Sequence, residues 1–286
     1  MRLALQQARK RAGLTQNQVA EEMEWSTSKV IRIENGDVTI SANDLRSLLG
    51  FLGVRDRATV TDLLAATRIA RTRQRQAWYQ AEEFRDTLTD DLRKLIEYES
   101  EATEIRSYSI YYIPGPLQTR DYATALMSRY EDELTEDQRT RRVEARMRRR
   151  EALLGRPDGV RILLMVDESV LRRTIGGPAV FADQLRDLKK HVRDGTVRIR
   201  MVPFSLDASV TNNASFDLLR MSVGEALYRE TGLGDEMIED HDTAAKHHAR
   251  YDRVWNEAAD EEDTIQFIEA QIKELERAVA DRARQK

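Results

Sequence analysis

Residues 14–37, LTQNQVAEEMEWSTSKVIRIENGD, decide the fold of the N-terminal part of the chain, because they hold two short helical patterns only a few residues apart. Thr15, followed three residues later by Gln18, is a capping box, in which two side chains satisfy N–H groups at the start of a helix. This pattern predicts a helix that begins at about Gln16. The apolar residues of that helix share one face, and they are Val19, Ala20 and Met23.

The second helical pattern runs from about residue 26 to residue 35. Ser26 is a favourable N-cap, Val30 and Ile33 form an apolar stripe, and Gly36 stops the helix. Helices this short are marginal alone, so both must pack on other segments. The outer face of the second helix is not needed for packing and is free to bind a partner; it carries Thr27, Ser28, Lys29 and Arg32.

Three further amphipathic stripes flank this pair, within residues 5–12, 45–52 and 60–64. Together the five stripes predict a compact all-α domain whose second and third helices form a helix-turn-helix. In this motif the second helix of the pair enters the major groove of DNA.

Residues 3–65 resemble the helix-turn-helix domain of the Cro/phage-repressor (XRE-type) family, through LTQNQVA, STSKVIRIENG and the Leu-rich fourth helix. The resemblance implies a sequence-specific regulator that binds a double-stranded DNA operator. It places Gln16 where a glutamine supports a phosphate contact, and it places Thr27, Ser28 and Arg32 where base edges are read. Three more positions correspond to residues near phosphates, and they are Ser26, Lys29 and Asn35.

Glu24 departs from the family pattern, which usually has glycine at this position of the turn. A residue other than glycine at positive φ is strained, so we expect the turn and the angle of the second helix to be slightly reshaped. The alternative to a DNA-binding domain is an ordinary helical bundle with a solvated polar face. The agreement of the helix starts, helix stops and apolar stripes favours the DNA-binding domain.

The charge is distributed unevenly along the chain. Residues 1–75 contain 13 Lys and Arg against 8 Asp and Glu, a net charge of +5, which leaves −9 for the rest of a chain whose total is −4. A basic N-terminal part suits phosphate binding, and the acidic remainder is repelled by DNA. We therefore expect DNA affinity that falls steeply with salt.

The composition excludes several other classes of protein. There is no cysteine, so neither disulfides nor thiolate metal sites are expected. No apolar run approaches the ~20 residues of a membrane helix, and the N-terminus has no signal-peptide core. These features predict a cytoplasmic protein that does not contact a membrane.

The length of 286 residues favours two domains. ARTRQRQAWYQ, residues 70–80, changes from basic to aromatic and leads into acidic sequence. We predict a helix-turn-helix domain at 1–69, a linker or connecting helix at 70–81, and a C-terminal domain for sensing, partner binding and dimerisation at 82–286. The basic run is either solvated or an extension of the phosphate-binding surface.

The C-terminal domain shows both helical and strand patterns. Helices are expected over residues 82–107 and after Thr119. Strands are expected at 160–166 and 197–204, and SFDLLRM and ALYRE predict an antiparallel hairpin around Gly224. The predicted fold class is therefore multidomain, with an all-α five-helix helix-turn-helix domain followed by a mixed α+β (α/β-type) domain.

This C-terminal part is also similar to a known group. PGPLQTRDYA, DESVLRRTIGG, QLRDL and VRIRMVPF occur in the order found in actinobacterial WhiJ-like, antitoxin-like transcriptional regulators, although Pro116 replaces a leucine of the usual pattern. The resemblance extends over about residues 78–280. It implies a regulator whose C-terminal domain responds to a ligand or to a small partner protein encoded nearby.

Seven arginines lie within residues 139–150. Four of them form a stripe at helical spacing: Arg139, Arg142, Arg146 and Arg149. This stripe is either a second DNA-contacting surface or, as we favour, a solvated face that pairs with the acidic residues at 131–137 while Val143 and Met147 turn inward.

No pattern supports catalysis or metal binding strongly. Asp167 and Glu168 follow a strand, where an α/β enzyme often keeps its acids, but carboxylates also suit a helix N-terminus. His241, His247 and His248 have no matching carboxylates or spacing for a metal site. We predict no catalytic residue, no metal and no cofactor, and keep an enzyme with an accessory helix-turn-helix as the alternative function.

A homodimer is expected, because one helix-turn-helix module reads only half of a two-fold operator. The best candidate seam is a heptad stripe near the C-terminus: Ile265, Ile268, Ile272, Leu275 and Val279. The stripe spans only two heptads, so closure of the domain's own core is the favoured alternative.

Overall fold

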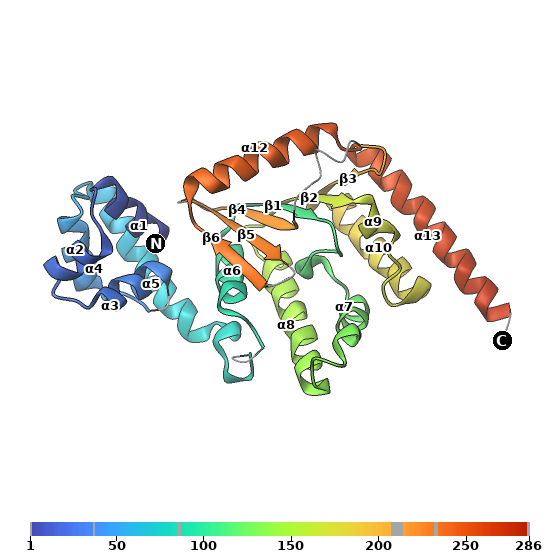
Figure 1. Ribbon diagram of the computed structural model, residues 1–286, viewed down its shortest axis with the longest axis horizontal. Coiled ribbons are helices and arrows are strands. Elements are labelled where there is room, and N and C mark those ends of the chain that lie inside the picture. The colour runs from blue at the N-terminus through green and yellow to red at the C-terminus, as the bar shows by residue number, and fades with distance from the viewer. Residues whose placement is uncertain are drawn as a thin grey trace. The chain divides into compact units, whose positions relative to one another are not determined.

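The computed structural model describes residues 2–36, 38–84, 87–206, 214–222, 224–231 and 234–284. The chain divides into two compact units, Met1–Ala81 and Glu82–Lys286. The first unit is helical and the second combines a sheet with helices (Figure 1). The predicted fold class is therefore confirmed.

The first unit contains five α-helices and one short 3₁₀ helix. Their bounds are α1 Arg2–Arg11, α2 Gln16–Glu22, α3 Thr27–Asn35, α4 Ala42–Phe51, α5 Arg57–Gln76 and η1 Trp78–Gln80. The residues predicted to begin and end α2 and α3 do so in the structure. Thr15 and Gln18 form both hydrogen bonds of the capping box, Ser26 accepts from the Lys29 N–H, and Gly36 ends α3 at φ 82°.

The core of the first unit is formed by the predicted stripes. Leu5 of α1, Val19 of α2 and Val30 of α3 pack with Leu45 and Leu49 of α4, all at most 3% exposed. Burying such side chains contributes roughly 1.5–3 kcal/mol each, which is how helices of seven to ten residues persist.

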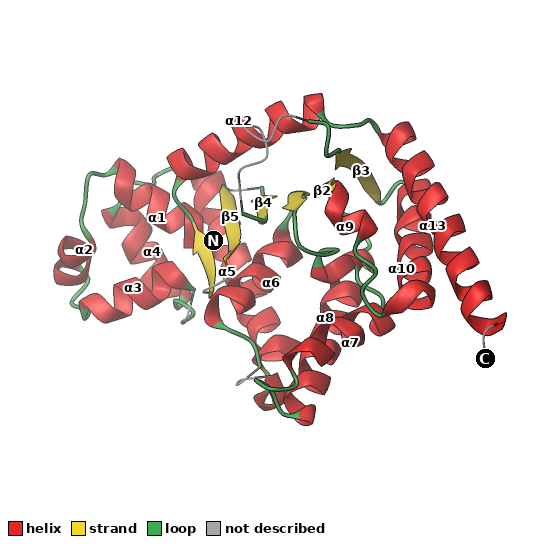
Figure 2. Cartoon of the chain, turned by 45° about the vertical axis from the view of Figure 1, so that its right-hand side comes forward, coloured by secondary structure: helices red, strands yellow, loops and turns green. Residues whose placement is uncertain are grey.

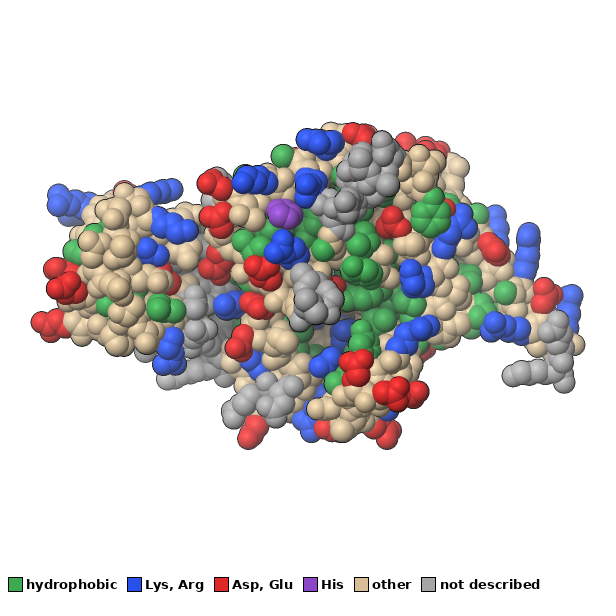
Figure 3. All heavy atoms as spheres, in the orientation of Figure 1, with side chains coloured by type: hydrophobic (Ala, Val, Ile, Leu, Met, Phe, Trp, Pro, Cys, Tyr) green, Lys and Arg blue, Asp and Glu red, His purple; other side chains and the backbone are tan. Residues whose placement is uncertain are grey.

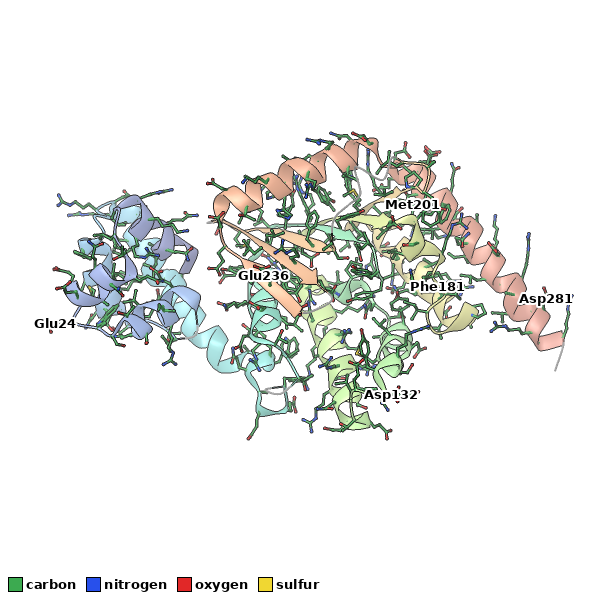
Figure 4. All side chains as sticks on the ribbon, viewed as in Figure 1. Glu24, Asp132, Phe181, Met201, Glu236 and Asp281 are labelled. Carbon is green, nitrogen blue, oxygen red and sulfur yellow. The ribbon has the colours of Figure 1, made fainter. Side chains whose placement is uncertain are left out.

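The turn between α2 and α3 has the strain expected from its sequence. Among the described residues other than glycine, Glu24 alone has a positive φ, at 53°. Figure 4 shows Glu24 at the surface of this turn. The Trp25 N–H donates to the Ala20 carbonyl at 2.8 Å, so the chain turns sharply despite the strain.

Helix α5 continues beyond the predicted stripe to Gln76 and includes most of the segment expected to connect the domains. The side chains of residues 68–76 lie outside the described part of the structure. The role of the basic run therefore stays a prediction.

The second unit is built on a six-stranded mixed sheet with the order β3-β2-β1-β4-β5-β6. The strands are β1 Glu104–Ser109, β2 Arg161–Asp167, β3 Val197–Val202, β4 Phe216–Arg220, β5 Glu225–Thr231 and β6 Gly234–Ile238. Strands β1, β2 and β3 are parallel to one another, and β1, β4, β5 and β6 pair antiparallel in turn. The predicted hairpin is thus the β4–β5 pair.

Helices lie on both faces of this sheet (Figure 2). The α-helices are α6 Asp90–Glu101, α7 Arg120–Met127, α8 Glu136–Leu154, α9 Glu168–Arg172, α10 Gly177–Arg193, α12 His241–Glu257 and α13 Glu261–Arg284. Three short 3₁₀ helices are η2 Glu82–Phe84, η3 Gly115–Leu117 and η4 Ser128–Tyr130.

The face that packs against α12 has an apolar centre, and charged side chains such as Arg106 and Arg200 bond to α12 around it. Tyr108, Leu218 and Leu227 of the strands form one cluster with Tyr251 and Val254 of α12. In Figure 3, hydrophobic side chains also gather on the drawn side of this unit below α12. The buried cluster under α12 is an ordinary hydrophobic core, whereas the side chains visible in Figure 3 lie at the surface.

The prediction of one long helix over 82–107 is wrong in part. Helix α6 covers only Asp90–Glu101, and Glu104–Ser109 forms β1, which pairs with β2 on one side and β4 on the other. Four of the six β1 residues are polar, namely Glu104, Arg106, Ser107 and Ser109, although five of the six are buried. The strand therefore shows neither an apolar run nor a regular alternation that would predict it.

The heptad stripe near the C-terminus closes the core of its own unit along most of its length. Ile268, Ile272 and Leu275 are at most 8% exposed, and α13 packs along α10. Val279, at the end of the stripe, is 38% exposed. The favoured alternative, core closure, therefore holds for the three buried residues.

Candidate functional site

Helix α3 presents a polar face on the side away from its buried residues. Val30 and Ile33 point into the core at 3% and 2% exposure. Ser28 and Arg32 are exposed, and the neighbouring Ile31 is 37% exposed. A short helix whose outer side carries a hydroxyl and a guanidinium is the geometry that reads base edges in the major groove.

Ser26 and Thr27, at the start of α3, already have local partners. The Ser26 hydroxyl accepts from the Lys29 N–H at 3.1 Å and therefore caps the helix. The Thr27 hydroxyl donates to Asn17 Oδ1 at 3.0 Å, which ties α3 to α2. Both bonds are exposed, so DNA can compete for these hydroxyls without removing a buried contact.

Lys29 is held by two neighbours. Its Nζ lies 3.7 Å from Asp44 Oδ2 and 3.9 Å from the centre of the Trp25 ring. The side chains of Lys29 and Asp44 are both 41% exposed, so this ion pair is weak in water. A phosphate contact by Lys29 requires exchange of the Asp44 carboxylate for a phosphate.

Gln16 takes part in a buried network that the sequence did not indicate. Gln16 Nε2 donates to Glu34 Oε2 at 2.8 Å, and Arg9 binds both oxygens of the same carboxylate at 2.7 and 2.9 Å. Glu34 is 5% exposed. Glu34 and Arg9 were missed because neither position belongs to an apolar stripe or to the outer face of α3.

Asn35 is the last residue of α3, and its side chain lies outside the described part of the structure. Its predicted phosphate contact therefore stays a prediction. The remaining six predicted DNA-binding residues come together on the start of α2 and the first two turns of α3.

The second unit contains a cavity of about 270 Å³ between the sheet and helices α6 and α8. The residues that line it include the following three groups. The apolar residues are Leu88, Leu92, Ile96, Met127 and Ala145. The tyrosines and acids are Tyr112, Tyr130, Tyr228, Asp217, Glu230 and Asp235. The arginines are Arg142, Arg146 and Arg149.

The sheet face toward this cavity is polar. Ser107 of β1, Asp217 of β4 and Tyr228 of β5 lie in one row across the strands, and Glu230 pairs with Asp235 one row further along. Polar side chains on a covered sheet face cost free energy unless they are paired or bind something. The face under α12, by contrast, has an apolar centre.

The favoured interpretation of the arginine stripe as a solvated face is wrong for three of its four residues, although Val143 is turned inward as expected. Arg142, Arg146 and Arg149 line the cavity instead. Arg149 binds the buried Glu99 with both ends of its guanidinium, at 2.7 and 2.6 Å. Within the upstream acidic segment, Asp137 forms an ion pair with Arg141 at 2.7 Å. Glu99 lies 50 residues from Arg149, so local sequence could not reveal the pair.

Gly115 of the PGPLQ segment lies where a larger residue would crowd Arg149. A Cβ at this position would lie 3.2 Å from Arg149 Nη1, so glycine allows the loop to pass over the guanidinium. Pro116 and Leu117 beside it are buried. The loop therefore helps to fix Arg149 at the wall of the cavity.

Burial shifts the pKa of several cavity groups. It raises the pKa of Asp217 to about 6, against the opposing effects of the Ser107 hydroxyl and Arg149. It also raises the pKa of Glu230, which accepts a hydrogen bond from the Tyr112 hydroxyl. Burial lowers the pKa of Arg146, although Tyr112 and Glu230 favour its charge. The cavity is therefore a place where charge is costly.

The other candidate residues have structural partners. Asp167 accepts from the Ser169 N–H and caps α9, while Glu168 binds Arg172 and the Phe204 N–H at 2.6 and 2.8 Å. Asp167 and Glu168 thus occupy the helix N-terminus that was the alternative to catalysis. Within the described ranges, no group of three or more His, Asp or Glu residues is arranged to hold a metal ion.

Two regions of the chain match known protein families. Residues 92–270 match the family described as Domain of unknown function (DUF5753), and residues 1–63 match the family described as Helix-turn-helix domain. No curated protein and no solved structure gives a significant match. Helices long and apolar enough to cross a membrane are absent from the described part of the chain.

Proposed function

Because the chain belongs to the DUF5753 family and carries a helix-turn-helix domain ahead of that region, we propose that it is a sequence-specific DNA-binding transcriptional regulator. The helix-turn-helix domain reads an operator in the major groove. The C-terminal domain responds to a ligand or to a small partner protein.

The observation that carries this proposal is the outer face of α3. Ser28 and Arg32 are exposed on a helix whose opposite side is fixed in the core by Val30 and Ile33. An arginine held in this way can bind two acceptors of a guanine edge, and such a contact discriminates by about 1–3 kcal/mol. Gln16, fixed by Glu34, supports the neighbouring phosphate contact.

The resemblance to XRE-type regulators and to the WhiJ-like, antitoxin-like group supports finer features of the proposal. These are a small partner protein encoded nearby, a cytoplasmic location and a homodimer that binds a two-fold operator. A homodimer supplies the second half-site contact that one module lacks.

We propose that the protein is not an enzyme. Asp167 and Glu168, the acids best placed for catalysis by sequence, are engaged in capping α9 and in the contacts of Arg172 and Phe204. The alternative function, an enzyme or ligand-processing domain with an accessory helix-turn-helix, predicts a chemical activity that survives deletion of residues 1–75.

The test is to recover bound DNA with the full-length protein. Genomic fragments are incubated with the protein, separated from free DNA and sequenced over several rounds. We expect enrichment of one pseudo-palindromic sequence, with half-sites about one helical turn apart, near ~10 base pairs. Enrichment of no sequence over the input, at a salt concentration where binding is detectable, would refute sequence-specific reading.

A further inference from the structure

The cavity of the second unit has groups that the protein's own contacts leave incomplete. Arg149 has its carboxylate, Glu99, but Arg142 and Arg146 have no carboxylate within ion-pair distance among the described residues. The hydrogen bond that Arg146 makes there is from Nη1 to the Arg142 carbonyl at 3.1 Å. A guanidinium carries five donors, so most of those on Arg146 have no acceptor in the part of the chain that the structure describes.

The two arginines stand on one side of α8, four residues apart, so they can approach the same group. The nearby Glu230 accepts a hydrogen bond from the Tyr112 hydroxyl, and among the described residues it forms no ion pair with Arg146. Leaving a desolvated guanidinium without an anion is costly. Two guanidinium groups with no ion-pair partner in the described structure, at one cavity wall and one of them desolvated, therefore indicate an anion that comes from outside the protein.

A second wall of the cavity is suited to a different part of the ligand. Leu88, Leu92 and Ile96 present apolar surface from the side of α6, and Tyr112 and Tyr130 add aromatic rings. Gln118 also lines the cavity; its Nε2 donates to the Ile113 carbonyl, and its buried Oε1 has no partner within the described structure. The cavity thus offers an acid-binding end, an apolar wall and a free acceptor.

We propose that this cavity binds a small organic acid, a molecule with one carboxylate or phosphate on a compact apolar or aromatic body. Arg142 and Arg146 hold the acid group, and the α6 side covers the body. The volume of about 270 Å³ lies just below the ~300–1,000 Å³ of typical small-molecule sites, so the ligand is small. This inference names the ligand class of the responsive domain, and only its regulatory consequence rests on the proposed function.

The experiment uses three probes with similar bodies: benzoate, phenyl phosphate and the neutral benzyl alcohol. Binding to the full-length protein is measured by calorimetric titration and by the shift in Tm at millimolar probe. We expect saturable binding of benzoate, of phenyl phosphate or of both, and much weaker binding of benzyl alcohol. Whichever of benzoate and phenyl phosphate binds with the higher affinity identifies the acid group that the site prefers.

Two variants on α8 test the assignment of the arginines. Arg146→Gln should weaken binding of the preferred acid by about tenfold or more, because it removes charge-assisted hydrogen bonds. Its Tm without probe should not fall, since an unpaired desolvated charge has been removed. Arg141→Gln is the matched control, because Arg141 is on the same helix but forms an exposed ion pair with Asp137, and its affinity should stay unchanged.

Three results would overturn the inference: neither acid binds saturably, benzyl alcohol binds as well as the acids, or Arg146→Gln binds them like the wild type. Operator binding is measured separately by gel shift on the same preparations. Acid binding without any operator binding would leave the cavity assignment standing and reject the proposed function. Operator binding without acid binding would reject the cavity assignment and leave the proposed function standing.

Discussion

Gln16 at the start of α2 is hydrogen-bonded to Glu34 near the end of α3, with 2.8 Å between Nε2 and Oε2. The same carboxylate holds Arg9 of α1, so one buried acid connects three helices of the first unit. A side chain positioned in this way is ready to meet a phosphate without further loss of conformational freedom. The position of Gln16 therefore depends on Glu34.

Glu34→Ala should destabilise the first unit by about 3 kcal/mol, because it leaves the mostly buried Arg9 without its carboxylate. Thermal unfolding followed by calorimetry measures the loss. Glu21→Ala, at an exposed position of α2, serves as the control and should stay within about 0.5 kcal/mol of the wild type. Equal stabilities of the two variants would show that the network contributes little.

Glu24→Gly should stabilise the first unit by about 0.5–1 kcal/mol, because the left-handed conformation at φ 53° costs glycine much less than glutamate. Glu22→Gly tests the opposite case, since Glu22 is the last residue of α2 and glycine there should cost up to about 1 kcal/mol of helix stability. Chemical denaturation gives both values. A loss of stability in Glu24→Gly would mean that the turn is not strained.

Asp217→Asn should become more stabilising, relative to the wild type, as pH rises. Burial raises the pKa of Asp217 to about 6, so between its unfolded and folded pKa values the native state holds a proton that the unfolded chain has released. Ionisation of Asp217 therefore lowers wild-type stability as pH rises through this window. The difference between variant and wild type should grow by about 1 kcal/mol between about pH 5 and about pH 7.

Urea unfolding of the second unit at both pH values measures this difference. Asp137→Asn is the control, because Asp137 is exposed on the surface of α8, and it shows how much the loss of a surface carboxylate alone changes the same two measurements. A pH-independent effect of Asp217→Asn would contradict a raised pKa at the cavity.

Ile268→Ala should cost about 2–5 kcal/mol of the second unit's stability, because the Ile268 side chain of α13 is fully buried in the core of that unit. Val279→Lys, at the exposed end of the same stripe, should leave unfolding unchanged. Sedimentation of both variants then separates core from seam. A folded, monomeric Ile268→Ala variant beside a dimeric wild type would favour the seam, and a monomeric wild type with and without DNA would reject the proposed homodimer.

The parts of the fold that local sequence determines could be predicted. Thr15, Ser26 and Gly36 mark the ends of α2 and α3 by bonds to residues only a few positions away. The β4–β5 hairpin has the same local character. Strand β1 could not be predicted, because four of its six residues are polar, and their burial depends on helices and strands far away in the sequence.

The cavity was hidden from the sequence for a related reason. Its parts come from α6, α8, β1, β4, β5 and β6, and partners such as Glu99 and Arg149 or Tyr112 and Glu230 are 50 and 118 residues apart. The stripe of arginines was visible in the sequence, but its burial depends on the whole sheet. Acidic residues at inward positions of predicted strands, such as Asp217 and Glu230, were the available signal.

The central claim is that α3 reads DNA, and a gel-shift titration of Arg32→Ala on the recovered operator tests it most directly. We expect binding weakened by about 1–3 kcal/mol and relaxed preference at one or two base pairs, because an exposed guanidinium that contacts a base edge has been removed. Gln16→Ala should instead weaken operator and unrelated DNA alike. An Arg32→Ala titration that coincides with the wild type on the operator would contradict the placement of α3 as the reading helix.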